Sequence, residues 1–162
     1  MLIAVVADTH LPRGARRLPD ACVERMAGAD LILHAGDFLT TGVMGEIEAL
    51  GPPLHAVRGN VDEPELRRRL PERLTVDAHG ARIGLVHDAG ERRGRLARMR
   101  RRFPGADAVV FGHSHMPLHE REGSFQIFNP GSPTERRRAP AHSMGVAHAG
   151  DRELRFEHVA LD

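Results

Sequence analysis

The stretch Asp107-Ala-Val-Val-Phe-Gly-His-Ser-His-Met-Pro117 decides how the rest of the chain is interpreted. A short apolar run, residues 108–111, breaks at Gly112 and delivers two histidines, His113 and His115. Apolar runs of this length, bounded by turn residues, are typical of a buried strand. Two imidazoles at the end of such a strand lower stability unless something binds them, and a metal ion is the partner we expect. A lone His-x-His also occurs at ordinary strand edges, so the metal hypothesis requires further ligands at other strand ends.

Length and composition predict one soluble domain covering residues 1–162. The net charge of +1 gives no reason to expect binding to nucleic acid or to a membrane surface. All 23 basic residues are arginine, which excludes lysine-based catalysis. Cys22 is the single cysteine, so no internal disulfide can form, and a reducing compartment is indicated. Because no segment has the length of a membrane span or the pattern of a signal peptide, we expect a cytoplasmic protein.

The first apolar run, residues 2–7, is rich in β-branched residues and predicts a buried first strand. It ends in Asp8-Thr9-His10. Side chains of an extended backbone repeat every two residues, so Asp8 and His10 fall on the same side. Burying an aspartate at a strand end is costly unless it is paired or coordinated, although an aspartate that merely caps the next loop is the simpler alternative.

Two further strands follow the same plan. Residues 31–35 form an apolar run that ends at Gly36-Asp37, and residues 54–57 form a short one that ends before Asn60. Each run therefore delivers a side chain with a metal-binding oxygen to a strand end. His34 lies inside its strand, and we expect it to be a hydrogen-bonded interior histidine and not a ligand.

The remaining elements follow from apolar spacing and from turn residues. Helical spacing predicts helices over residues 19–28, 41–50, 62–69 and 91–103. Three hairpins are predicted, over residues 74–78 with 81–86, 118–122 with 124–128, and 142–149 with 153–160 around Gly150-Asp151. The second strand of the first hairpin runs directly into His87. The arginine-rich side of the fourth helix is expected to be a solvated face, because aromatic residues that could stack on bases are almost absent.

The polar side chains at the strand ends form one set of seven candidate ligands: Asp8, His10, Asp37, Asn60, His87, His113 and His115. In an open α/β sheet these ends converge at the carboxyl edge, where such sheets place their sites. Seven candidates are too many for one tetrahedral ion. They suit two ions that share a carboxylate at a separation of roughly 3.5–4 Å. Imidazole and carboxylate ligands without thiolate favour Mn, Fe, Zn, Co or Ni over Mg or Ca.

Taken in order, these residues form five motifs: Asp8-x-His10, Gly36-Asp37, Gly59-Asn60-x-Asp62, His87 after a strand, and Gly112-His-x-His115. The chain thereby resembles the calcineurin-like metallophosphoesterases. Asn129-Pro-Gly-Ser132 is typical of their small bacterial and archaeal phosphodiesterase branch. Each motif alone is weak, whereas five in the same order are specific. The resemblance implies an α/β fold, a four-layer α/β/β/α sandwich with two facing sheets.

The same resemblance implies the roles of the seven residues. Asp8, His10, Asp37 and His115 would hold the first of two divalent ions, and Asp37 would bridge to a second ion that also takes Asn60, His87 and His113. Manganese is the favoured metal, with iron, zinc, nickel and cobalt as alternatives. The implied reaction is hydrolysis of a small phosphodiester or phosphomonoester by a metal-bridging hydroxide, with Asp37, Asn60 and His113 positioning the hydroxide and the phosphate.

The chain departs from the wider family at two positions. Val61 stands where many relatives carry a histidine that protonates the leaving group, a residue that the small phosphodiesterase branch commonly lacks too. Asp88 stands where many relatives carry glycine, and we expect it to be a loop residue. Asp62 is expected to cap a helix or to support the ligands, and not to act as a catalytic acid.

Two other functions remain open in this family. One is a protein-binding scaffold, since a eukaryotic retromer subunit has a similar fold with an impaired metal site. The other is a nuclease-like enzyme, against which the nearly neutral charge argues. The complete set of ligands favours a hydrolase over the scaffold. Relatives form dimers and larger assemblies, so a homo-oligomer is a further possibility.

Overall fold

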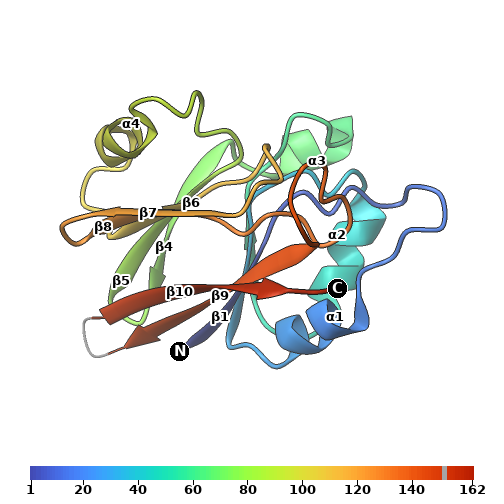
Figure 1. Cartoon of the computed structure of the whole chain (residues 1–162). Helices are drawn as coiled ribbons and strands as arrows, with labels where there is room; N and C mark the ends of the chain where they lie inside the picture. The colour runs from blue at the N-terminus through green and yellow to red at the C-terminus, as the bar shows by residue number, and fades with distance from the viewer. Residues whose placement is uncertain (151–152) are drawn as a thin grey trace.

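Two five-stranded sheets, each built around parallel strands, form the centre of the computed structural model, which describes residues 1–150 and 153–162 (Figure 1). In spatial order, the first sheet consists of β10 (Glu153–Ala160), β9 (Ser143–Gly150), β1 (Leu2–Val6), β2 (Leu31–His34) and β3 (Leu54–Ala56). The second consists of β4 (Arg73–Ala78), β5 (Ala81–Val86), β6 (Ala108–Val110), β8 (Phe125–Asn129) and β7 (Leu118–Glu122). The strand runs and the three hairpins predicted from the sequence therefore all form, although the turn residue Asp151 lies outside the described residues.

Both sheets contain three neighbouring strands that pair in parallel. In the first sheet β1 pairs with β2 and β2 with β3, and in the second β5 pairs with β6 and β6 with β8, all in parallel. The pairs β1–β9, β9–β10, β4–β5 and β7–β8 are antiparallel, so β3 is the one edge strand among the described residues that pairs in parallel. Parallel neighbours present their carboxyl ends at one edge, so the residues that follow β1, β2 and β3, and those that follow β5 and β6, are gathered in two rows.

Three apolar clusters separate the layers. The largest lies between the sheets, where Val5 and Leu33 of the first sheet meet Leu85 and Val110 of the second. Alternate residues of β1, such as Val6, point to the opposite face and pack in a second cluster. This two-sided burial explains why β1 is apolar at successive positions, because alternate side chains enter different cores.

The helices cover the outer faces of the two sheets. On the first sheet, α1 (Asp20–Ala27) contributes Cys22 and Met26, and α2 (Thr41–Glu48) contributes Ile47. On the second, α4 (Arg95–Arg102) contributes Met99, which packs with Phe103 and Ile127. The order of layers is helix, sheet, sheet, helix, which confirms the predicted α/β/β/α sandwich. The short α3 (Pro64–Arg69) follows β3 and packs Leu66 into the core of the first sheet.

The fourth helix is shorter than the sequence predicts. The sequence predicts a start at residue 91, but α4 begins at Arg95 because Gly94 takes a left-handed conformation, with φ of 68°. The guanidinium of Arg98 donates to the carbonyls of Ala89 and Glu91 and so ties the preceding loop to the helix. Within the described part of the chain, none of the helices is both long and apolar enough to cross a membrane.

Candidate metal centre

The seven candidate ligands lie at the ends of five parallel strands drawn from both sheets. Asp8 and His10 follow β1, Asp37 follows β2 and Asn60 follows β3. On the facing sheet, His87 follows β5, and His113 and His115 follow β6. The candidate ligands of the first sheet therefore face those of the second across the gap between the sheets.

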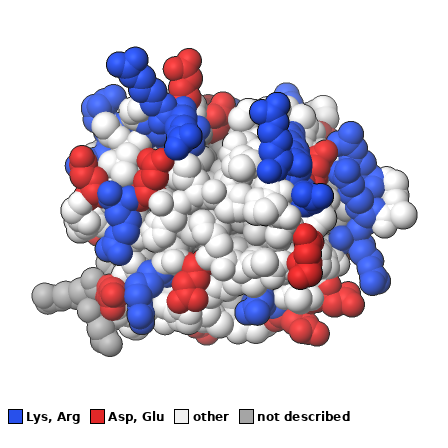
Figure 2. All heavy atoms as spheres, viewed as in Figure 1, with Lys and Arg blue, Asp and Glu red and all other residues white. Residues whose placement is uncertain are grey.

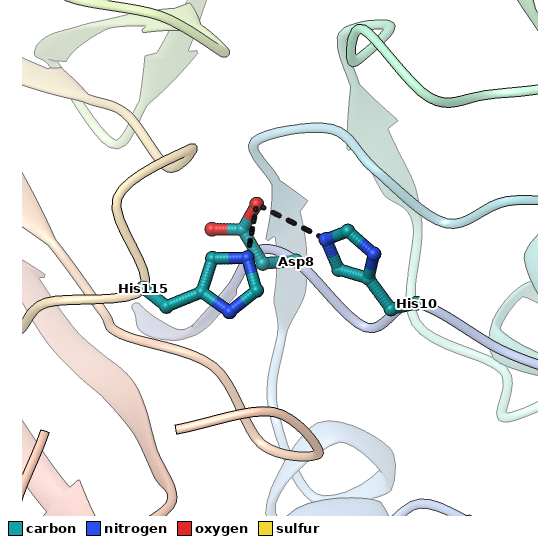
Figure 3. A group of neighbouring side chains, drawn as sticks. All are labelled: Asp8, His10 and His115. Atoms are coloured by element: carbon teal, nitrogen blue, oxygen red, sulfur yellow. Dashed lines mark ion pairs between the residues drawn. The ribbon is translucent and has the colours of Figure 1, made fainter. Parts of the chain in front are cut away.

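The first group of ligands consists of Asp8, His10 and His115, all buried (Figure 3). One carboxylate oxygen of Asp8 lies 3.7 Å from Nε2 of His10 and 3.6 Å from Nε2 of His115. The two imidazoles are neighbours that both face this oxygen, with ring centroids 4.8 Å apart, and each follows a strand of a different sheet (Figure 3). Their ligand atoms all lie within 4.8 Å of one another, a spacing that one cation can span.

The second group is arranged around the other buried aspartate. Oδ2 of Asp37 lies 3.4 Å from Nε2 of His10 and 3.2 Å from Nε2 of His87. Asn60 Oδ1 lies 2.9 Å from Nε2 of His87 and 2.9 Å from Nδ1 of His113. Asp37 therefore stands between the first group and the second, with histidines on both sides. Asn60 and His113 are exposed, so the second group opens to solvent.

Three of these side chains have buried polar atoms that lack a hydrogen-bond partner in the described structure. They are Oδ2 of Asp8, Nε2 of His10 and Nε2 of His115. Leaving such an atom unpaired costs roughly 1–3 kcal/mol, and more for a charged group. A cation held by the Asp8 carboxylate would give both Nε2 atoms a partner and would offset the charge of the buried carboxylate. The arrangement therefore fits a divalent metal ion.

The backbone at the candidate ligands is strained. Asp8, His10, Asp37, His113 and His115 all have positive φ, between 44° and 69°. Non-glycine residues rarely adopt this left-handed region, which costs roughly 1–2 kcal/mol per residue and is found mainly at functional sites. The strain turns each side chain toward the gap between the sheets. Five strained positions in one pocket are expected of a site selected for ligand geometry and not for stability.

Two glycines let the backbone approach the carboxylates closely. A Cβ on Gly112 would lie 2.9 Å from Oδ2 of Asp8, and one on Gly59 would overlap the side chain and the amide of Asp37. Only hydrogen fits at these positions. Gly112 therefore lets the second sheet pack against Asp8, and Gly59 lets the loop after β3 pack against Asp37 of the same sheet.

Asp62 supports the loops that carry the ligands. Its buried carboxylate accepts backbone hydrogen bonds from Gly59 (2.6 Å), Asp37 (3.3 Å) and Leu39 (3.0 Å). It does not cap α3, whose N-cap is Glu63. Of the two roles considered for Asp62, support of the ligands is therefore the one the structure bears out.

Hydrogen bonds to backbone carbonyls orient two of the histidines. Nδ1 of His87 donates to the carbonyl of Ala35 (2.7 Å), and Nδ1 of His115 donates to the carbonyl of Glu135. A histidine that donates from Nδ1 keeps the lone pair of Nε2 free for a metal. Both Nε2 atoms face the carboxylates described above, so the tautomers suit metal binding.

Glu135 is the residue near the site that the sequence did not reveal. Its Oε2 is buried without a hydrogen-bond partner among the described residues and lies 3.7 Å from Nδ1 of His10, while its carbonyl holds His115. It also lies 3.4 Å from Arg13 and 3.6 Å from Arg16. In the sequence, Glu135 is marked only by its position three residues after Ser132. That position has no regular spacing to the ligands.

His34 behaves as predicted for an interior histidine. It is fully buried, accepts a hydrogen bond from the amide of Gly36 (3.1 Å) and stacks on Phe38. Burial lowers its pKa to about 3, so it stays neutral. Asp88 likewise meets the expectation of a loop residue, since it is exposed and accepts a hydrogen bond from Gly90.

Comparison with known proteins connects this geometry to a family. A family model described as the calcineurin-like phosphoesterase superfamily domain matches residues 1–152. The chain belongs to this superfamily. A probable metallophosphoesterase of Methanothermobacter thermautotrophicus is 35% identical over 136 residues, which are 83% of this chain and 78% of that protein. Family and relative place this phosphoesterase among metal-dependent hydrolases, and divalent metals are the cofactors of the superfamily.

Solved structures share the fold of this phosphoesterase. Vps29 of Entamoeba histolytica, solved in complex with Zn²⁺, matches with a TM-score of 0.77 and 22% identity over the full length of both chains. A protein named as a novel archaeal phosphodiesterase matches with a TM-score of 0.74 and 20% identity, over 98% of this chain and 100% of that one. At these identities the likeness establishes the fold alone.

The charges in the site call for a cation. Burial alone would lower the pKa of His87, but the carboxylates of Asp37 and Asp8 outweigh it and raise the pKa to about 9. Burial would likewise raise the pKa of Asp37, but contact with His87 and a hydrogen bond from the amide of Val61 lower it. Without a metal, the phosphoesterase therefore keeps a proton on His87 that neutralises the buried carboxylates.

This proton predicts how the stability of the metal-free protein depends on pH. The pKa of His87 is higher in the folded protein than its unfolded value of about 6.5, so its contribution is fully present below pH 6.5 and is lost as pH rises through 9. We expect thermal unfolding in a chelator to show a loss of up to about 3 kcal/mol between pH 7 and pH 10. His87→Gln should remove this loss, and an equal loss in that variant would contradict the assignment.

Glu135 predicts an effect on metal affinity. Glu135→Gln keeps the carbonyl that orients His115 but removes the negative charge beside His10. We expect about tenfold weaker binding of the first metal ion, at the low end for groups that support ligands. Titration of Mn²⁺ or Zn²⁺ against a chromophoric chelator measures the affinity. Glu122→Gln, which alters an exposed pair with Arg100, is the matched control, and equal affinity in the two variants would rule out this role.

Proposed function

We propose that this phosphoesterase hydrolyses phosphodiester bonds with two divalent transition-metal ions bound by Asp8, His10, Asp37, Asn60, His87, His113 and His115. Manganese is the favoured metal, with iron, zinc, nickel and cobalt as alternatives. The substrate is a small phosphate ester. Residues 1–162 serve as one catalytic domain, since strands from the first and the last thirds of the chain pair in the same sheet.

A single observation carries this proposal, the position of the Asp37 carboxylate. Its Oδ2 lies within 3.4 Å of Nε2 of His10 on one side and within 3.2 Å of Nε2 of His87 on the other. His10 and His87 come from different sheets, so one carboxylate oxygen faces both groups of ligands. This is the arrangement required of a ligand shared by two ions.

When two divalent ions are bound, they lower the pKa of a water molecule between them and offset the charge that develops on a phosphoryl group. The residues of the chain prepare the site for this chemistry. Asp37 is held by the amide of Val61 (3.0 Å), and His87 by the carbonyl of Ala35. Asn60 and His113 line the exposed side, where the phosphate of the substrate enters.

Val61 shapes the choice of substrate. It is 45% exposed beside Asn60, at the position where many relatives carry a histidine as general acid. A valine cannot donate a proton to a departing alkoxide. Esters whose leaving groups have a low pKa should therefore be cleaved faster than ordinary alkyl esters.

A protein-binding scaffold is the alternative function, favoured by the structural likeness to Vps29. The orphaned polar atoms of Asp8, His10 and His115 argue against it, because a scaffold has no need for buried, strained and unpaired ligands.

Hydrolysis of bis(4-nitrophenyl) phosphate and of 4-nitrophenyl phosphate, each with added Mn²⁺, tests the proposal. We expect faster turnover of the diester than of the monoester. This activity should be lost when the metal is chelated and should return when Mn²⁺ is restored. Faster turnover of the monoester would make the protein a phosphatase. Metal-free protein that is inactive with every divalent transition metal would favour the scaffold.

A further inference from the structure

A cavity of about 580 Å³ opens beside the exposed half of the metal centre. Asn60 and His87 of the metal centre line it together with Arg58 and Arg102. Its volume is within the range of small-molecule sites, roughly 300–1,000 Å³. Arginine side chains gather on the same side of the molecule, over the parts that Figure 1 labels α3 and α4 (Figure 2). The cavity is therefore continuous with the proposed phosphate site and positive in character.

Two arginines from different layers share one carboxylate in this cavity. Arg58 follows β3 of the first sheet, and Arg102 ends α4 on the outer face of the second. Nη2 of Arg58 lies 3.6 Å from one oxygen of Glu72, and Nη2 of Arg102 lies 2.9 Å from the other. The two guanidinium groups are thus spaced so that a single oxyanion can bridge them. Arginine is the side chain best suited to such planar contacts with phosphate.

The side chain of Glu72 is held only weakly between these arginines. Its side chain is 64% exposed, and an exposed ion pair of this kind contributes little stability. It can therefore turn into solvent when a stronger oxyanion arrives. A phosphoryl group carries more charge and more acceptor oxygens than a carboxylate, so it should displace Glu72.

The other charged residues of the cavity are already engaged. Arg67 donates to the backbone carbonyls of Asp62 and Asn60 and so holds the loop that carries Asn60. Asp88 accepts a hydrogen bond from the amide of Gly90 (2.7 Å). Arg58 and Arg102 each donate from Nη1 to a backbone carbonyl, that of Arg67 (3.3 Å) and that of Asp88 (3.4 Å), while Nη2 of each faces the exposed carboxylate of Glu72 and can turn to a ligand.

We propose that Arg58 and Arg102 form a second anion subsite, which selects phosphate esters that carry another phosphoryl group beside the scissile one. This inference rests on the proposed function, because the scissile phosphate is placed against Asn60 and His87, which line the same cavity. A bisphosphorylated substrate would span the cavity, with one phosphate at the metal centre and the other between the arginines in place of Glu72.

A matched pair of chromogenic diesters tests this subsite. Thymidine 5′-(4-nitrophenyl phosphate) and its 3′-phosphorylated derivative differ only in the second phosphate, and both release nitrophenol. We expect the native protein to have the higher kcat/KM for the 3′-phosphorylated ester. Arg102→Gln should reduce this preference about tenfold, the effect of one charge-assisted hydrogen bond. Glu72→Gln should increase it by about two- to fivefold, because the competing carboxylate is gone.

Arg100→Gln is the matched control. Arg100 lies on the same helix and pairs with a single glutamate, Glu122, but it does not line this cavity. Its substitution should leave the preference unchanged. The subsite is overturned if the native protein shows no preference, if Arg102→Gln keeps it, or if Arg100→Gln lowers it as much.

A binding measurement separates this proposal from the proposed function. Calorimetry with thymidine 3′,5′-bisphosphate on metal-free protein reports the arginines without any hydrolysis. We expect Arg102→Gln to weaken binding about tenfold and Arg100→Gln to leave it unchanged. If the native protein cleaves neither ester but shows this pattern of binding, the hydrolase proposal fails and the anion site stands. If both esters are cleaved at equal rates and Arg102→Gln binds as the native protein does, the subsite alone fails.

Discussion

Asp37→Ala should abolish hydrolysis and remove both metal ions together. The substitution takes away the carboxylate oxygen that faces His10 on one side and His87 on the other. Metal ions contribute several kcal/mol of charge stabilisation to such reactions, and each 1.4 kcal/mol corresponds to a factor of ten in rate. We therefore expect a loss of roughly 1,000-fold or more in kcat/KM. Elemental analysis of the purified variant should find less than one metal ion per chain.

Asp20→Ala is the matched control for this substitution. Asp20 lies in the first turn of α1, and its side chain is 80% exposed, so both activity and metal content should be unchanged. A folded Asp37→Ala variant that keeps one ion and loses the other would contradict the bridging role. Circular dichroism distinguishes that outcome from general unfolding.

Gly59→Ala should displace the Asp37 carboxylate, whereas Asp37→Ala removes it. A Cβ at position 59 would overlap both the side chain and the amide of Asp37, whose backbone is held by Asp62 and cannot easily shift. Overpacking of a closed site typically costs 1–3 kcal/mol. For a chain of this size we expect the melting temperature to fall by about 5–10 °C, and affinity for the metals to fall at least about tenfold.

The same substitution in a helix should have the opposite sign. Gly45 lies inside α2 with no other atom within 4 Å of an added Cβ, so Gly45→Ala should raise stability by about 0.5–1 kcal/mol. Thermal melts and metal titrations of both variants make the comparison. If Gly59→Ala is as stable as Gly45→Ala and binds metal normally, the close packing around Asp37 is not required.

Much of this architecture could be predicted from local patterns. The apolar run before Asp8 and the run before Asp37 are buried on both sides, so each is a strand whose polar end is unmistakable. Parallel pairing then gathers these ends at one edge, which is why the candidate ligands could be chosen without coordinates. The order of the motifs indicated the family. The resemblance to that family in turn implied a second sheet that faces the first.

Other features depend on tertiary contacts that leave no regular trace in a sequence. His10 and His115 take a left-handed backbone conformation that neither residue type requires. Glu135 reaches His10 across 125 positions of the chain. The late start of α4 arose from one glycine inside an otherwise helical pattern. The arginines around Glu72 belong to different layers, so their meeting could not be foreseen from charge runs.

The proposed function requires that the phosphoesterase bind two cations, one on each side of Asp37. Anomalous diffraction from crystals soaked in Mn²⁺ tests it most directly. We expect two peaks, roughly 3.5–4 Å apart, one between Asp8, His10 and His115 and the other beside Asn60, His87 and His113. A single peak, or peaks away from the Asp37 carboxylate, would contradict it.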